Sequence, residues 1–471
     1  MSRTELVVAP AMAKTIVLVP VGSLGVGVRE EEVKRGIAAG ANVIALDAGS
    51  TDSGAAYLAT GVAKYNREAV KRDLRILMAA QAEAQIPLLI GSCGQSGSDA
   101  AVDWVRDIAV EVANELAIAP RIAVLYSEQD GTLIKTKSAR GDIRALPPLS
   151  PLTDETIDRC AHIVAMMGPE PYIAALRAGA DIVLGGRTTD TAVLAAVPLM
   201  RGAGIAASWH AGKVGECGAQ CTVDSSGAAG VLIRVDTDGF DIEPLSPAER
   251  CSVHSVSGHM LYENADPFLL TEPGGVLDVT DADYRSVDDR TVRVTGSKWQ
   301  AMPYTMKLEG AGPGPFQTIM LIGIEDPEVL AALEVFRDRL YAALVDRVEQ
   351  TFGEEAGDYD ISLRIYGWNA VSGRPVPKGS APPREVGVLF VASAATQSLA
   401  TRIAKACNPY FFHFPLLRGK DLPSYAFPFS PSEIERGRVY EFLLNHAVAV
   451  DDPLELVTTE WVNLRAPPAE S

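Results

Sequence analysis

The chain reads Gly40-Ala41-Asn42-Val43-Ile44-Ala45-Leu46-Asp47-Ala48-Gly49-Ser50-Thr51-Asp52-Ser53 early in its length. A related pattern returns as Gly179-Ala180-Asp181-Ile182-Val183-Leu184-Gly185-Gly186-Arg187-Thr188-Thr189-Asp190. Each copy leads from a helix end through Gly-Ala into an apolar strand and then into a turn that ends in Thr-Asp. The repetition predicts two related strand–turn units whose turns open on one cleft. Chance similarity between two βα units is the alternative interpretation.

The segments around these repeats indicate the fold class. Apolar runs such as 15–19 and 87–90 alternate with helical patterns such as 64–84 and 100–116. Strands that alternate with helices of this length form βαβ units, so we predict an α/β fold with a mainly parallel sheet core. Short β-rich runs between Gly, Pro and Asp clusters predict a β-hairpin-rich portion over about 208–325.

The C-terminal part of the chain predicts a second domain. Residues 353–360 are rich in glycine and acidic side chains, which is typical of a linker. Beyond them, short β-rich runs and helical patterns, one of them over 431–444, predict a small α+β domain of ferredoxin-like type over 361–471. Residues 1–352 would then form the catalytic α/β domain.

Composition narrows the choice of partners. The 471 residues carry 60 acidic and 42 basic side chains, a net charge of −18. This balance disfavours nucleic acid and anionic membranes, because nucleic-acid affinity depends on neutralising phosphates. There is no run of 18 apolar residues that would span a membrane. Six scattered cysteines indicate a reducing, cytoplasmic setting. We expect a homo-oligomer that binds a small anionic substrate, either a carboxylate or an acyl-CoA.

Candidate site residues follow from the ends of the predicted strands, where parallel sheets bind ligands. Asp52 and Asp190 are candidate acid–base catalysts or metal ligands, with helix capping as the alternative. Arg187 is suited to a bidentate grip on a substrate carboxylate, with a buried ion pair to Asp190 or another acid as the alternative. The loops 22–27 and 91–97 offer backbone N–H groups to an anion, or serve only as tight turns. Neither loop has a dinucleotide or ATP fingerprint.

Two further segments combine reactive side chains. Glu216 and Cys217 lie among small residues, so Cys217 is a candidate nucleophile or a buried small side chain. His259 and Glu263 are four residues apart, which on a helix would place them on one face. They could relay a proton or bind a metal, although one His and one Glu are too few for a metal site, or they could form a surface pair. The predicted catalytic residues are Asp52, Asp190, Glu216, Cys217, His259 and Glu263. The predicted substrate-binding residues are Ser23, Gly25, Thr51, Ser92, Cys93, Gly94, Arg187, Thr188, Thr189, Asn264 and Lys307. Lys307 would bind an anion or pair with Glu309.

Several of these segments together resemble the acyclic terpene utilisation (AtuA-like) family. The residues that carry the resemblance are 47–54, 185–190, 215–219, 258–267 and 303–311, and the likeness covers most of 14–345. The tail from about 360 looks like the ferredoxin-like domain often attached in that family. The resemblance implies a bacterial catabolic enzyme of terpenoid or organic-acid breakdown, often with acyl-CoA intermediates.

Three functions fit these features. The first is a hydratase or lyase acting on a small organic acid or its CoA thioester, because carboxylates and an arginine are expected at the strand ends. The second is a hydrolase or acyl-transfer enzyme that uses Cys217. The third is a non-catalytic subunit that binds an acyl ligand. No cofactor and no metal ligands are predicted. A requirement for a divalent metal and a CoA-linked substrate are alternatives that the sequence does not decide.

Overall fold

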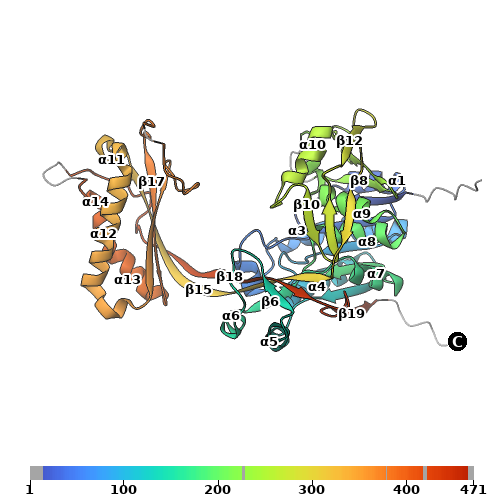
Figure 1. Cartoon of the computed structure of the whole chain (residues 1–471), viewed down its shortest axis with the longest axis horizontal. Helices are drawn as coiled ribbons and strands as arrows, with labels where there is room; N and C mark the ends of the chain where they lie inside the picture. Colours follow the sequence, from blue (N-terminus) through green and yellow to red (C-terminus); the bar gives the residue numbers. More distant parts are fainter. Residues whose placement is uncertain (1–13, 225–228, 378, 417–421, 465–471) are drawn as a thin grey trace, which may run out of the picture. The chain divides into compact units, whose positions relative to one another are not determined.

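The computed structural model describes residues 14–224, 229–377, 379–416 and 422–464. The chain divides into two compact units, which are described one at a time (Figure 1). Unit 1 comprises residues 1–312 and 442–471, and unit 2 comprises residues 313–441. Within the described ranges, no helix has the length and apolar character needed to cross a membrane.

Unit 1 is built on a ten-stranded mixed sheet in the order β12-β13-β9-β8-β1-β2-β3-β7-β4-β19. Its parallel part consists of β1 (Thr15–Val19), β2 (Val43–Asp47), β3 (Leu88–Gly91), β7 (Ile182–Gly185) and β4 (Arg121–Tyr126). The antiparallel strands are β8 (Val231–Val235), β9 (Gly239–Pro244), β13 (Val292–Thr295), β12 (Asp283–Ser286) and β19 (Thr458–Asn463).

The α/β class is therefore confirmed, but the prediction of a mainly parallel sheet is corrected to a mixed one. The correction arises in the β-rich portion predicted over 208–325. Its hairpin strands β8, β9, β12 and β13 do not only lie over the core. They continue the central sheet from the edge of β1, where β8 pairs antiparallel along the whole of β1.

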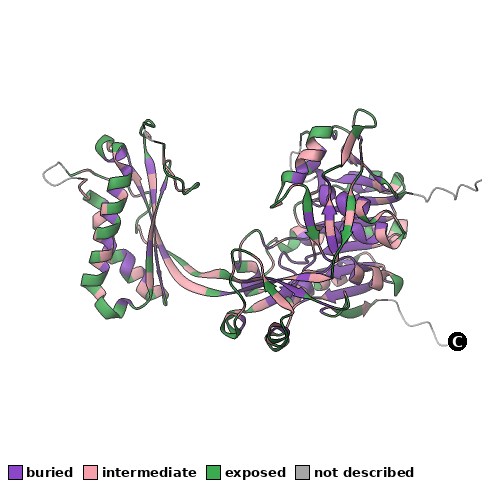
Figure 2. Cartoon of the chain, viewed as in Figure 1, coloured by how far each residue is buried: buried purple, intermediate pink, exposed green. Residues whose placement is uncertain are grey.

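Helices cover both faces of the parallel strands because side chains of a strand point alternately to opposite faces. In β2, Val43 and Ala45 belong to one apolar core, whereas Ile44 and Leu46 belong to the other. The first core includes α7 (Glu170–Arg177), α8 (Asp190–Met200) and α9 (Ile205–Gly215), and the second includes α1 (Glu30–Ala38), α3 (Arg67–Ala84) and α4 (Asp99–Glu115). Figure 2 shows the buried strands between these helices.

Smaller elements complete unit 1. A three-stranded sheet contains β10 (Leu269–Glu272), β11 (Gly275–Asp278) and β14 (Lys298–Ala301). The remaining helices are α2 (Ala56–Thr60), α5 (Gly131–Arg140), α6 (Asp154–Arg159), α10 (Val253–Gly258), η1 (Gly218–Cys221) and η2 (His259–Leu261). The short strands β5 (Ile143–Ala145) and β6 (His162–Ala165) pair with β18 and β15, respectively, which are described next.

Unit 2 contains an antiparallel sheet with helices packed against it. Its strands are β15 (Thr305–Ile324), β16 (Tyr359–Tyr366), β17 (Val386–Ala394) and β18 (Ile434–Ala449), and β15 and β18 begin or end in unit 1. The helices are α11 (Pro327–Ala331), α12 (Leu333–Phe352), η3 (Gly353–Ala356), α13 (Gln397–Cys407) and α14 (Tyr410–His413). The strand order is β16-β17-β15-β18, and an apolar core centred on residues such as Phe336 and Phe390 joins sheet and helices.

These boundaries differ from the predicted division at 353–360. The helix α12 belongs to unit 2, and the predicted linker holds η3 and the start of β16. Residues 442–464 belong to unit 1, where β19 pairs with β4 and the Arg121 guanidinium lies 4.0 Å from the Trp461 ring centroid. The predicted helix over 431–444 is wrong, because this segment is strand β18, in which Leu444, His446 and Val448 are buried at every second position.

Candidate functional site

A pocket of about 270 Å³ lies in unit 1 beyond the carboxyl ends of the parallel strands. Asp47 is the last residue of β2, and Asp190 is the first residue of α8 after the turn that follows β7. This is where ligands bind in parallel sheets. The lining residues are Gly22, Ser23, Asp47, Gly49, Ser50, Asp52, Ser53, Lys64, Tyr65, Gln95, Asp190, Glu216, Cys217, Tyr262 and Glu263.

Asp52 and Asp190 line the same pocket, so the prediction that both turns open on one cleft is confirmed. Neither aspartate is a helix cap. Thr189 caps α8, and its side chain accepts a hydrogen bond from the N–H of Ala192 at 3.2 Å. The helix after Asp52 begins at residue 56 and has no side-chain cap. Helix capping, the common structural role of aspartate at such positions, therefore does not occupy these two carboxylates.

The pocket gathers carboxylates whose charges repel one another. Burial raises the pKa of Asp47 well above its usual range, and the nearby Asp190 raises it further. Burial also raises the pKa of Asp190 and of Glu216, although Arg187 opposes the first shift and Lys213 opposes the second. A group of this kind takes up or releases a proton closer to neutral pH than a free carboxylate does.

Glu263 has a raised pKa, and three residues at or near the pocket have strained backbone angles. The pKa of Glu263 is raised by burial and by the neighbouring aspartates of the pocket. Glu263, Gln95 and Ser92 have positive φ angles of 56°, 96° and 45°. Non-glycine residues in this region cost about 1–3 kcal/mol each and cluster at functional sites. The site thus holds a strained Glu263 at its rim and a strained Gln95 in its wall.

Arg187 does not line the pocket, and the alternative of a buried ion pair is the one observed. Only 4% of Arg187 is exposed, and its Nε donates to Glu309 Oε2 at 2.9 Å. The guanidinium also donates to the Ser92 hydroxyl at 3.1 Å and lies 3.4 Å from Asp190 Oδ1. Lys307 Nζ donates to the other Glu309 oxygen at 2.8 Å, so its pairing alternative is also the one observed.

The Arg187–Glu309 ion pair contacts residues of the turns that carry the pocket aspartates. Although burial opposes ionisation of Glu309, Arg187 and Lys307 hold its pKa at about 2. The Thr51 hydroxyl donates to the same carboxylate at 3.1 Å, which ties the turn before Asp52 to the pair. Arg187 and Thr51 therefore act as positioning residues of the two Thr-Asp turns.

In the glycine loops, most backbone N–H groups donate to other groups of the protein. The N–H groups of Gly25, Gly27 and Val28 donate to the Asp73 carboxylate at 2.8–3.1 Å, so this loop does not offer them to an anion. Ser23 of the same loop lines the pocket, and its buried Oγ has no hydrogen-bond partner among the described residues. Gly22 allows close packing, because a Cβ there would lie 2.7 Å from the Cys217 carbonyl oxygen.

Apart from Ser23, all of the predicted binding residues, ten in number, lie outside the pocket lining. Ser92 and Cys93 donate their N–H groups to Gly186 and Gly185 at 3.1 and 2.9 Å. A Cβ on Gly94 would lie 2.7 Å from Ala101. The residues outside the lining are Gly25, Thr51, Ser92, Cys93, Gly94, Arg187, Thr188, Thr189, Asn264 and Lys307. Their contacts are structural: the Thr188 hydroxyl lies 2.8 Å from the Tyr172 hydroxyl, and Asn264 Nδ2 donates to the Met260 carbonyl at 2.7 Å.

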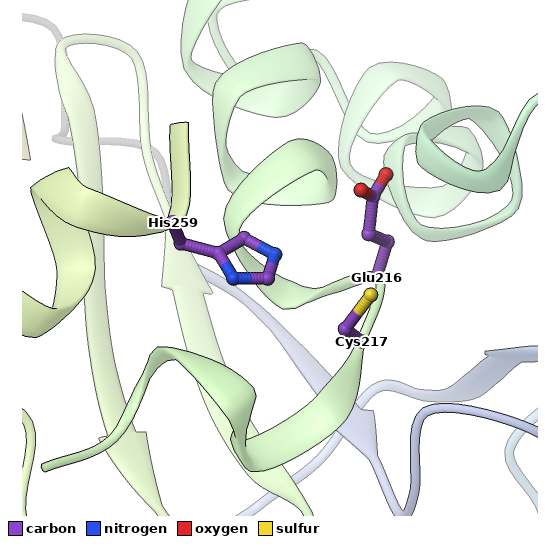
Figure 3. Close-up of side chains that lie close together, drawn as sticks. All are labelled: Glu216, Cys217 and His259. Carbon is purple, nitrogen blue, oxygen red and sulfur yellow. The ribbon is translucent and has the colours of Figure 1, made fainter. Parts of the chain in front are cut away.

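His259 and Glu263 do not share one helix face. His259 begins the short helix η2, which ends at Leu261, and the positive φ of Glu263 turns the chain away. His259 instead approaches Glu216 and Cys217, and the ligand atoms of these three side chains all lie within 4.8 Å of one another (Figure 3). The sequence therefore paired His259 with the wrong neighbour, because in the structure it lies beside Glu216 and Cys217.

With the geometry established, the chain can be compared with known proteins. The model of one family, described as "Acyclic terpene utilisation family protein AtuA", matches residues 46–422. The chain belongs to this acyclic terpene utilisation family. No curated protein and no solved structure matches the chain. The resemblance that the motif segments indicated is thereby confirmed, and it relates the chain to bacterial terpene utilisation.

In this AtuA family member, most of the pocket comes from the matched range. The lining residues from Asp47 to Glu263 all lie inside it, whereas Gly22 and Ser23 precede it. The sequence analysis did not name nine of the lining residues as site residues: Gly22, Asp47, Gly49, Ser50, Ser53, Lys64, Tyr65, Gln95 and Tyr262. It also missed Lys213, which lies beside the pocket. Lys213 pairs with Glu216 three residues later, a helical spacing that the sequence displays. Asp47 stands at the strand end in the first repeat, but nothing in the sequence shows the strained backbone of Gln95.

Proposed function

We propose that this AtuA family member is an acid–base enzyme, with hydration or dehydration of a small organic acid or its CoA thioester as the favoured reaction. The observation that carries the proposal is the shared pocket of Asp52 and Asp190, which Glu216 and Glu263 also line. Adding water to a double bond needs a base that takes one proton from the water and an acid that gives one proton to the adjacent carbon. Neighbouring carboxylates in unlike environments can divide these roles.

We assign the base to Asp190 and the acid to Glu263 or Asp52. Asp190 is half-buried at the start of α8, and burial raises its pKa, which strengthens it as a base, while the nearby Arg187 opposes this shift. Asp52 and Glu263 are exposed at the rim, where they can exchange protons with water. In hydration, Asp190 takes a proton from water as the oxygen bonds to carbon, and the rim acid protonates the neighbouring carbon. Dehydration reverses both transfers.

The charge of the pocket favours a thioester over a free acid as the reacting group. A free carboxylate would be repelled by Asp52 and Asp190, whereas a thioester is uncharged at its reacting end. Lys64 is the cation that lines the pocket, and its Nζ donates to the Ser53 hydroxyl at 2.6 Å. A space of about 270 Å³ suits an acyl group rather than a whole CoA.

A substrate screen tests the proposal. The purified full-length protein would be incubated with hydroxy acids, unsaturated acids and the CoA thioesters of both, and product formation followed by mass spectrometry. We expect a change of 18 mass units, for loss or gain of water, with at least one thioester. Binding of a thioester without any turnover would favour the non-catalytic acyl-binding subunit instead.

The second candidate, a Cys217-dependent hydrolase or acyl-transfer enzyme, is favoured by the proximity of His259 to Cys217. The thiol environment opposes it, because burial and the carboxylate of Glu216 raise the pKa of Cys217. A nucleophilic cysteine needs the opposite shift.

We therefore expect slow alkylation of Cys217 by iodoacetamide at pH 7.5 in chelator-treated protein. The rate should be at least about tenfold below that of the same cysteine in denatured protein, because only the thiolate reacts. Peptide mass spectrometry at successive times measures it. Rapid alkylation that disappears in His259→Ala would instead establish an activated thiol and favour the hydrolase.

Three further features belong to the same proposal. Unit 2 has the element order strand–helix–strand–strand–helix–strand and the strand order β18-β15-β17-β16, which support a ferredoxin-like fold. All six cysteines are free thiols, which supports a cytoplasmic setting. Homo-oligomerisation stays a prediction, and light scattering coupled to gel filtration measures it.

A further inference from the structure

We propose that Glu216, Cys217 and His259 form a binding site for one divalent transition metal of the zinc type at the wall of the acidic pocket. The proposal goes beyond the acid–base function, which assigns no metal. Its test measures metal binding and not turnover, so failure of one proposal leaves the other standing.

The three side chains come together from two elements of unit 1. Glu216 and Cys217 follow the last turn of α9, and His259 begins η2. Figure 3 shows the imidazole of His259 directed toward the other two side chains. Their ligand atoms all lie within 4.8 Å of one another. Ligand atoms around a tetrahedral zinc lie about 3.4–3.8 Å apart, because the bonds are about 2.0–2.3 Å long. Small side-chain rotations would bridge that difference.

An unpartnered nitrogen points independently to a ligand. Only 6% of His259 is exposed, and its Nε2 is buried without a hydrogen-bond partner among the described residues. A buried polar atom that lacks a partner costs about 1–3 kcal/mol. The ring stacks on Tyr262 with centroids 5.6 Å apart, which fixes its plane. A metal ion would bond to this nitrogen and remove that cost.

The surrounding charges favour a cation. Asp190 and Glu263 line the pocket beside Glu216 and Cys217, and repulsion among these acids contributes to the raised pKa of Glu216 and of Glu263. Lys213 Nζ bonds to Glu216 Oε1 and provides one compensating charge. The second oxygen of Glu216 can turn to the metal while that bond is kept.

The ligand atoms select the class of metal. A thiolate, an imidazole and a carboxylate suit zinc, cobalt or iron, whereas calcium and magnesium require oxygen ligands. Three protein ligands leave a fourth position open, as in catalytic rather than structural zinc sites. When the metal binds, the Cys217 sulfur loses its proton to solvent and bonds to the metal, so affinity should increase with pH.

A cobalt titration tests the site. Full-length protein would be stripped with a chelator, desalted and titrated with Co²⁺, followed by displacement with Zn²⁺. We expect one Co²⁺ per chain and a near-ultraviolet thiolate-to-cobalt band that Zn²⁺ abolishes. His259→Ala and Cys217→Ser should each weaken binding at least about tenfold. Cys217→Ser should also remove the band.

His254→Ala is the matched control, because His254 lies five residues before His259 but is exposed on α10. Its affinity should equal that of the wild type. Absence of the thiolate band, or equal affinity in His259→Ala and the wild type, would overturn the proposal. If a variant does not fold, alkylation of Cys217 is measured in the wild-type protein with and without Zn²⁺. Saturating Zn²⁺ should lower the rate at least about tenfold, and an unchanged rate would overturn the site.

Discussion

Glu309→Leu is expected to lower the free energy of unfolding of unit 1 by about 3–5 kcal/mol. The substitution removes the carboxylate that accepts hydrogen bonds from the Arg187 guanidinium and the Thr51 hydroxyl, at 2.9 and 3.1 Å. Arg187 is almost completely buried, so its charge would stay in the protein interior with only the more distant Asp190 carboxylate, at 3.4 Å, to offset it. Urea denaturation followed by tryptophan fluorescence measures the effect, because Trp209 and Trp299 stack on each other in unit 1.

Lys307→Ala is the control for this experiment. Lys307 pairs with the same carboxylate at 2.8 Å, but its side chain is 41% exposed, so solvent screens the interaction. Its loss should cost about 0–1 kcal/mol, as for other exposed ion pairs. Equal losses in both variants would show that the burial of Arg187 does not control the energy of the cluster.

The same cluster predicts how stability depends on pH. The folded protein holds the pKa of Glu309 at about 2, below the value of about 4.3 in an unfolded chain. A lowered pKa contributes stability that is present above the unfolded value and is lost as pH falls toward the folded one. The difference in stability between the wild type and Glu309→Leu should therefore be constant above about pH 5 and shrink between about pH 4 and 2.

The α/β class could be predicted because the spacing of apolar residues in a strand or helix can be read from a short window of sequence. Runs such as 43–47 and 182–185 predict strands without knowledge of their partners. Sheet order is not local. The placement of β8 beside β1, and of β19 beside β4 far along the chain, depends on contacts that no window of sequence contains.

The unit boundary was missed for a related reason. A chain of glycine and acidic residues at 353–358 has the composition of a linker, but it forms a turn of 3₁₀ helix between α12 and β16. The real boundary passes through β15 and β18, two long strands. In β15 the Gly- and Pro-rich stretch 310–315 coincides with the boundary between residues 312 and 313. The sequence analysis did not use this signal, because the stretch lies within a single long strand.

The sequence singled out five residues that line one pocket, but it did not determine the partner of Arg187. Asp52, Asp190, Glu216, Cys217 and Glu263 all line the pocket. Arg187 has the sequence context of a substrate-binding residue, but its partner Glu309 lies 122 residues away. The partner of a buried charge is set by tertiary packing, and a single sequence leaves both alternatives open.

Asp190→Asn is expected to lower kcat/KM by about 10²–10⁴-fold for the thioester that the screen identifies, the range that general acid–base groups contribute. Asparagine has nearly the same shape and keeps an oxygen toward the Arg187 guanidinium, now 3.4 Å from Asp190 Oδ1. It cannot take a proton from water. The melting temperature should therefore change little while turnover is lost, and thermal unfolding with steady-state kinetics separates the two.

Thr189→Ala is the matched control at the neighbouring position and should give the opposite pattern. Thr189 is the true cap of α8, so its loss should cost about 1 kcal/mol of stability. Its side chain does not line the pocket, so kcat/KM should stay within a few-fold of the wild type. If Asp190→Asn instead loses stability and keeps its turnover, Asp190 only supports Arg187. The base would then have to be sought at the rim, where Asp52 and Glu263 are the carboxylates in contact with water.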